Sequence, residues 1–92
     1  MDEPINDADV ARLAREVIET GTVVFTNHAR EQMRKRDLDE VDVTNVLRAG
    51  FCDGADFERK SWRYQMHTQK ICVVIVFRSE TKAVIVTAWR KS

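Results

Sequence analysis

One short segment of the chain combines an imidazole with several guanidinium groups. His28 opens it, and Arg30, Arg34 and Arg36 follow. A helix beginning here would hold the imidazole in its first turn, where the macrodipole and the nearby arginines favour the neutral ring. A neutral imidazole can act as a general base, which suits transfer of a proton in phosphodiester chemistry. A histidine at a helix start is also often only a cap or a surface residue, and this alternative stays open.

Other side chains join His28 in a candidate catalytic set. Arg36 lies two turns further on, roughly on the same side of the helix, and is placed to reach a phosphate near the imidazole. Arg63 and Thr87 lie in predicted strands and join the site if the helix starts beside those strands. We therefore predict catalytic roles for His28, Arg36, Arg63 and Thr87.

A second set is predicted to contact RNA: Arg34, His67, Trp89 and Arg90. Arg34 belongs to a solvated basic rim, and Trp89 offers an indole ring on which a base can stack. His67 ends a predicted strand beside a hairpin turn and is a second candidate for proton transfer, with an exposed turn histidine as the alternative.

Several kinds of site leave no trace in the sequence. A phosphate-binding glycine-rich loop, paired carboxylates, a metal cage and a G-x-S-x-G elbow are not found, so we expect no cofactor and no metal. Cys52 and Cys72 are interpreted as reduced, structural thiols. Residues 28–49 resemble a helix-turn-helix only superficially, because Glu40 and Asp42 would meet the DNA phosphates.

Three helices are predicted, over 7–20, 28–36 and 39–49, among the elements that must position these residues. Apolar residues recur at helical spacing in the first, with Asn6 as its cap and Gly21 as a left-handed stop. Asn27 is the predicted cap of the second helix.

Strands are predicted over 22–26, 61–67, 70–78 and 82–90, where β-branched and aromatic residues concentrate between short polar turns. Residues 51–58 are interpreted as a connecting loop or an irregular strand. The expected fold is α+β, with the helices packed on one face of an antiparallel sheet.

Two-residue turns would fix which side chains share a face of this sheet. One face is then almost wholly apolar and lies under the helices; it comprises Trp62, Tyr64, Met66, Ile71, Val73, Ile75, Phe77, Val84, Val86 and Ala88. The open face comprises Arg63, Gln65, His67, Cys72, Val74, Val76, Ile85, Thr87 and Trp89. This mixture suits a polyanion with stacking bases. The alternative is that the first helix or a partner chain covers it.

The 92 residues suffice for one domain, and no apolar run is long enough to span a membrane, so a cytoplasmic protein is expected. The zero net charge hides segregated charges. Residues 28–36 carry a net charge of +3 and residues 59–92 a net +7, whereas residues 1–27 carry −4 and residues 37–58 carry −6. The basic segments either form a functional surface or complement the acidic segments within the molecule.

The string from His28 to Leu38, HAREQMRKRDL, and the later AVIVTAW of residues 83–89 resemble the DUF4258 family. The resemblance covers residues 22–90, preceded by the helical region 1–21. Its architecture looks like that of compact RelE/BrnT-type ribonuclease toxins, grouped with barnase-like and colicin-like nucleases.

This resemblance implies a metal-independent endoribonuclease, the toxin of a toxin–antitoxin pair, with RNA as substrate and a cognate antitoxin as partner. His28, Arg36 and Thr87 fall on family-like positions. The hypothesis is that His28 withdraws the 2′-hydroxyl proton, Arg36 and Arg63 neutralise the phosphorane, and Thr87 orients an oxygen. The alternative function is a non-catalytic module that binds RNA or protein through the cationic sheet face.

Overall fold

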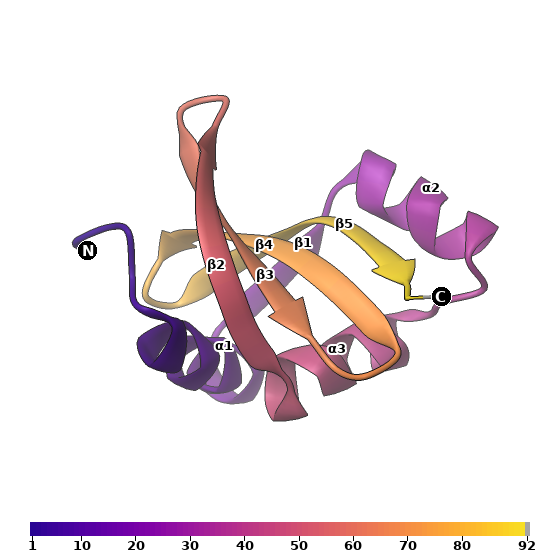
Figure 1. Ribbon diagram of the computed structural model, residues 1–92, viewed down its shortest axis with the longest axis horizontal. Coiled ribbons are helices and arrows are strands. Elements are labelled where there is room, and N and C mark those ends of the chain that lie inside the picture. Colours follow the sequence, from indigo (N-terminus) through magenta and orange to yellow (C-terminus); the bar gives the residue numbers. More distant parts are fainter. Residues whose placement is uncertain (92) are drawn as a thin grey trace.

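The computed structural model describes residues 1–91, which form three helices and five strands in the order αβααββββ. The helices are α1 (Asp7–Thr20), α2 (Asn27–Lys35) and α3 (Glu40–Ala49). The strands are β1 (Thr22–Phe25), β2 (Phe51–Glu58), β3 (Ser61–His67), β4 (Ile71–Ser79) and β5 (Lys82–Arg90). The predicted α+β fold is confirmed (Figure 1).

The strands form one sheet in the order β1-β5-β4-β3-β2. Three of its pairings are antiparallel, whereas β1 runs parallel to β5, which the long connection through α2, α3 and three strands permits. Residues 51–58, left open between loop and strand, form the edge strand β2. A bulge at Gly54 interrupts its pairing with β3.

The helix ends show why the chain turns where it does. The side chain of Asn6 caps α1, and Asp39 and Asp42 form a reciprocal capping box at α3. Two sequence predictions were wrong here. Thr26, not Asn27, caps α2, and Gly21 is extended rather than left-handed. Gly21 is needed for space, since a Cβ atom there would lie 2.3 Å from the carbonyl oxygen of Thr81.

The hydrophobic core lies between the helices and one face of the sheet. Helices α1 and α3 pack together and against this face, while α2 follows β1 directly and packs against β5. Tyr64, Met66, Val73 and Ile75 are fully buried there, as predicted. Burial of each such large side chain contributes about 1.5 to 3 kcal/mol.

The prediction of which β5 side chains face the core was wrong for half of the strand. Val74 pairs with Thr87 as expected, but Ile75 pairs with Ile85, so Val86 is an extra residue in a bulge. Ile85 is therefore buried in the core instead of lying on the open face, and Val84 and Val86 lie on the open face instead. The pairing register of β3 with β4 is also shifted by two residues from the predicted one, but an even shift leaves every side chain on its predicted face.

Among residues 1–91, no helix has both the length and the apolar character needed to cross a membrane.

Candidate functional site

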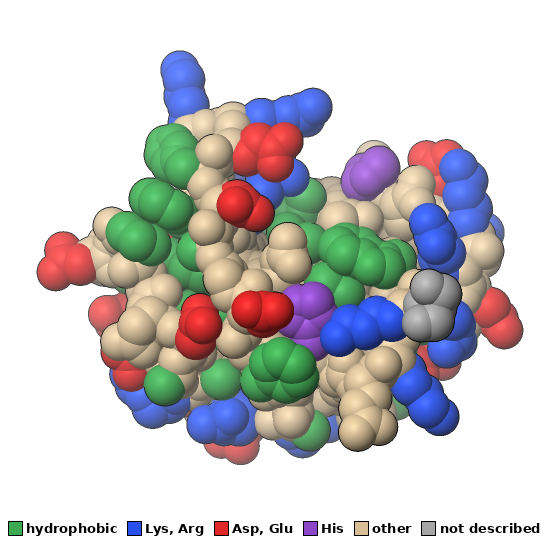
Figure 2. Space-filling model, viewed as in Figure 1, with side chains coloured by type: hydrophobic (Ala, Val, Ile, Leu, Met, Phe, Trp, Pro, Cys, Tyr) green, Lys and Arg blue, Asp and Glu red, His purple; other side chains and the backbone are tan. Residues whose placement is uncertain are grey.

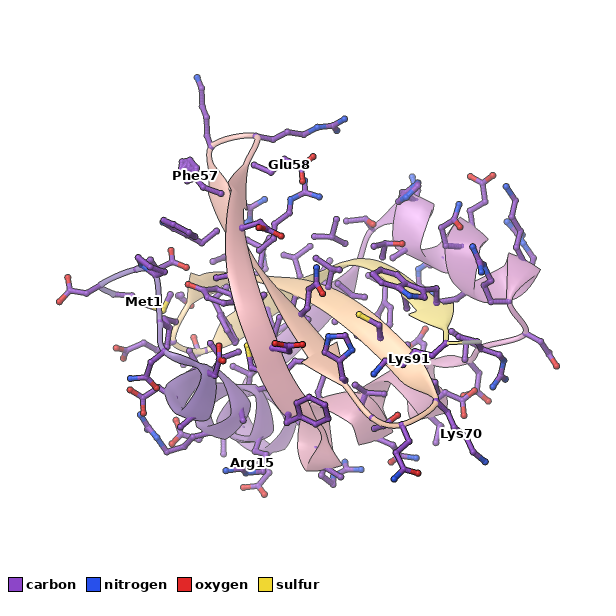
Figure 3. All side chains as sticks on the ribbon, viewed as in Figure 1. Met1, Arg15, Phe57, Glu58, Lys70 and Lys91 are labelled. Carbon is purple, nitrogen blue, oxygen red and sulfur yellow. The ribbon has the colours of Figure 1, made fainter. Side chains whose placement is uncertain are left out.

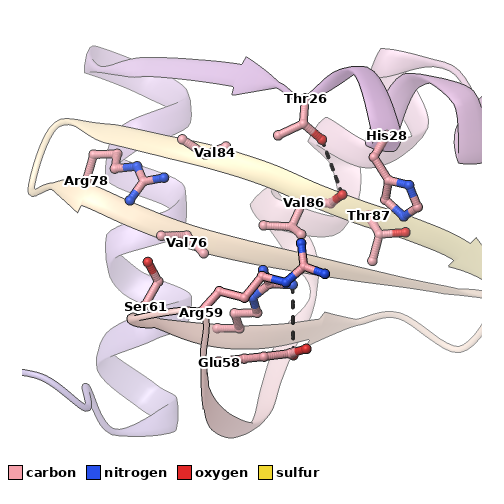
Figure 4. A pocket seen from close by; sticks show the side chains of 11 residues that line it. Thr26, His28, Glu58, Arg59, Ser61, Val76, Arg78, Val84, Val86 and Thr87 are labelled. Atoms are coloured by element: carbon pink, nitrogen blue, oxygen red, sulfur yellow. Dashed lines mark hydrogen bonds and ion pairs between the residues drawn. The ribbon is translucent and has the colours of Figure 1, made fainter.

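A groove of about 580 Å³ lies on the open face of the sheet, between the start of α2 and the β2–β3 hairpin (Figure 4). Valines 76, 84 and 86 make its apolar floor, and α1 and α3 lie on the other side of the sheet. The polar lining consists of Thr26, His28, Glu58, Arg59, Ser61, Arg63, Arg78 and Thr87. We call this surface the groove.

The start of α2 is fixed to β5 by Thr26. Its hydroxyl accepts a hydrogen bond from the amide of Ala29 at 2.9 Å and donates one to the carbonyl of Val86 at 3.3 Å. The Thr26 amide also donates to the carbonyl of Ile85. The bulge in β5 thus supplies the carbonyl that anchors the helix, and His28, two residues on, reaches the groove from the first turn of α2.

Arg63 is the most enclosed cation of the groove. Its side chain is 22% exposed, and its nearest acidic partner is Glu58, with 4.0 Å between Nη1 and Oε2. Glu58 is itself well exposed, so this contact is weak. The Arg63 Nε is buried and has no hydrogen-bond partner among residues 1–91. An unpaired buried donor costs about 1 to 3 kcal/mol, so the fold holds Arg63 in place at a cost.

The groove carries an excess of positive charge. Arg59, Arg63 and Arg78 line it against one carboxylate, that of Glu58. Hydroxyls of Thr26, Ser61 and Thr87 add hydrogen-bonding groups to the same walls. Positive charge, hydroxyls and an apolar floor together suit a ligand that has both phosphate and less polar parts.

Three of the four predicted catalytic residues line the groove: His28, Arg63 and Thr87. The structure does not bring Arg36 to it. Arg36 ends α2, at the opposite end of the helix from His28, because eight residues of helix separate the two by about 12 Å.

The predicted RNA-contacting residues also lie outside the groove. Arg34 lies in a shallow depression with Arg30 between α2 and α3. Arg90 donates to the backbone carbonyls of Arg36 and Asp37 at 2.9 and 2.7 Å and so holds the turn between the two helices. Trp89 is half-buried beside Cys72 on the open face.

His67 also lies on that face, stacked on Phe51. Burial and the nearby Lys91 lower the pKa of His67 below its ordinary value. The two thiols are buried, and burial raises the pKa of Cys52 to about 12 and that of Cys72 to about 11. Neither thiol is therefore a nucleophile near neutral pH.

Sequence reasoning missed Arg59 and Arg78 in the groove, together with Glu58, Ser61 and Thr26. Both arginines belong to the basic segment 59–92, so the charge pattern was the available signal. Within residues 1–91, no group of three or more His, Cys, Asp or Glu side chains is placed to hold a metal ion.

A family model described as DUF4258, a domain of unknown function, matches residues 25–90. This range contains every residue of the groove. Comparison with curated proteins and with solved structures found no match.

Proposed function

The chain belongs to the DUF4258 family, and we propose that it is a metal-independent endoribonuclease of the RelE/BrnT type, acting as the toxin of a toxin–antitoxin pair. The observation that supports this most is that one groove contains His28, Arg63 and Thr87 together with two further arginines. RNA is the proposed substrate, because phosphates attract the guanidinium groups and the substrate's own 2′-hydroxyl supplies the nucleophile.

In the proposed reaction, the 2′-oxygen forms a bond to phosphorus while the bond from phosphorus to the 5′-oxygen breaks. The 2′-hydroxyl proton passes to the His28 imidazole, and the leaving oxygen takes a proton from solvent. The products are a 2′,3′-cyclic phosphate and a 5′-hydroxyl.

Charge develops on the phosphorane oxygens during this step, and fixed donors stabilise it. Arg63 is the first such donor, since its side chain is held in the sheet and its Nε has no partner among residues 1–91. Arg59 and Arg78 replace Arg36 in the role that the sequence assigned to it, because they line the groove. Thr87 orients a nonbridging oxygen.

The test incubates purified protein with single-stranded RNA in EDTA. General base catalysis typically accelerates a reaction by about 10²- to 10⁴-fold. His28→Ala should therefore cleave RNA more slowly by that factor, while its RNA binding persists. His28 is exposed, so its truncation leaves the core intact. Arg15→Ala, on the exposed side of α1, is the matched control. Equal cleavage by wild type and His28→Ala would remove His28 from the mechanism.

A second candidate function, RNA binding without catalysis, is favoured by a different observation. A general base is usually oriented by a third group, but within residues 1–91 no hydrogen bond holds the His28 ring. This function predicts salt-sensitive RNA binding that is weakened by Arg63→Ala, with no products at any pH.

The toxin role has a cellular test. Induced expression of the wild type should arrest growth, and His28→Ala should restore it at equal protein level. Vigorous growth with abundant soluble wild-type protein would contradict toxicity.

A further inference from the structure

Four side chains form a row across the open face beside the groove. Phe51, His67, Cys72 and Trp89 are successive partners on β2, β3, β4 and β5. Directly paired residues of antiparallel strands project from the same face of a sheet. We call these four residues the aromatic row.

The aromatic row is continuous with the groove. Thr87, which lines the groove, precedes Trp89 by two residues on β5, so their side chains share a face. Two residues of a strand span about 7 Å. The Trp89 end of the row therefore lies within reach of a nucleotide next to the one in the groove, and the row extends from there across the sheet to Phe51.

The outer end of the row is an exposed aromatic ring. Phe51 is 55% exposed, although it stacks on His67 with ring centroids 5.6 Å apart at 25°. The Lys91 Nζ lies 5.8 Å from the Phe51 ring centroid and donates to the carbonyl of Thr68 at 2.8 Å. Figure 2 shows a histidine near the middle of the view, between an acidic and a basic side chain and with hydrophobic side chains above and below it.

The charges of the row suit a base better than a phosphate. Burial and Lys91 lower the pKa of His67, which favours the neutral imidazole, and the carboxylate of Asp53, on the same strand as Phe51, offsets the ammonium of Lys91. A carboxylate repels a phosphate but accepts a hydrogen bond from the amino group of a base. The three arginines of the groove have the opposite preference.

We propose that the aromatic row binds nucleobases of the single-stranded RNA whose phosphate occupies the groove, a role that rests on the proposed function. Phe51 and Trp89 lie on β2 and β5, three strand spacings of about 4.8 Å apart, so each ring stacks on a different base of the strand. Since every base has an aromatic face, this subsite tolerates sequence while fixing the strand against the groove.

The test compares Phe51→Ala with Phe57→Ala. Both rings lie on β2 and are exposed to nearly the same extent, 55% and 56%. Phe57, however, lies near the projecting end of the hairpin, away from Lys91 (Figure 3). Binding is measured by fluorescence anisotropy with a labelled uridine decamer carrying 2′-O-methyl groups, which block cleavage, and with inorganic polyphosphate. Circular dichroism confirms that each variant is folded.

Phe51→Ala should bind the decamer about tenfold more weakly than wild type, and Phe57→Ala should bind like wild type. Polyphosphate, which has no bases, should bind all three proteins equally. If Phe51→Ala binds the decamer like wild type while Arg63→Ala does not, the row is excluded and the groove stands. Equal weakening for polyphosphate would also exclude base stacking. A wild-type protein that binds no RNA would overturn the proposed function and the row together.

Discussion

At the scale of single residues, the arginines differ in how much the fold constrains them. Arg63 is 22% exposed, whereas Arg12 and Arg30 are 58% and 54% exposed and pair with carboxylates at the surface. A side chain held in place loses little conformational entropy when a ligand binds. Arg63 is therefore better prepared than the surface arginines to bind a phosphate.

His67 gives a prediction about pH and stability. Its pKa in the folded chain is lowered by burial, with Lys91 as a second cause, whereas the unfolded chain keeps the ordinary value of 6.5. The unfolded chain then binds more protons as the pH falls below 6.5, so stability decreases through that window down to the folded pKa. Between pH 7.5 and pH 5.5, the free energy of unfolding measured with urea should decrease more for wild type than for His67→Gln. Equal losses would show that His67 is not responsible.

At the scale of elements, the groove depends on two irregularities. The bulge at Val86 puts consecutive residues of β5 on the groove side and offers the carbonyl that Thr26 binds. On the other wall, the β2–β3 hairpin turns through Arg59 and Lys60, both with positive φ, 51° and 65°. Two-residue turns of this kind normally use asparagine and glycine, so the chain tolerates strain to place Arg59.

The strain at Lys60 can be measured. Glycine adopts the left-handed conformation at position 60 without strain, whereas alanine is strained there. Lys60→Gly should therefore be more stable than Lys60→Ala by about 1 kcal/mol. Lys60 does not line the groove, and the comparison of two uncharged variants removes the effect of the lost charge. Urea unfolding gives both free energies. An alanine variant at least as stable as the glycine variant would contradict strain in this turn.

The same irregularities mark where the sequence was informative and where it was not. Apolar spacing and the Asn6 cap predicted the helices closely, because those signals are local. The Arg59–Lys60 turn carries no glycine or asparagine, and β2 is acidic with Gly54 inside it, so neither looked regular. The bulge at Val86 leaves no mark in the period-two pattern of β5, and it moved half of the strand to the other face.

At the scale of the whole molecule, few ion pairs among residues 1–91 join the basic segments to the acidic ones. Of the five ion pairs among residues 1–91, only Arg30–Glu40 and Arg63–Glu58 join a basic segment to an acidic one. Both involve well-exposed carboxylates and contribute little. The positive charge of residues 59–92 is therefore available to a polyanion, and the groove with the aromatic row offers it a continuous path.

The central claim is that single-stranded RNA lies in the groove, with its phosphate between His28 and Arg63. It is tested most directly by NMR titration of the ¹⁵N-labelled protein with a uridine oligonucleotide carrying 2′-O-methyl groups. We expect salt-sensitive shifts confined to the amides of Thr26, His28, Arg63 and Thr87 and of the aromatic row, with α1 unchanged. Shifts that instead follow α1 or the Arg34 side of α2, and spare the groove, would contradict the account.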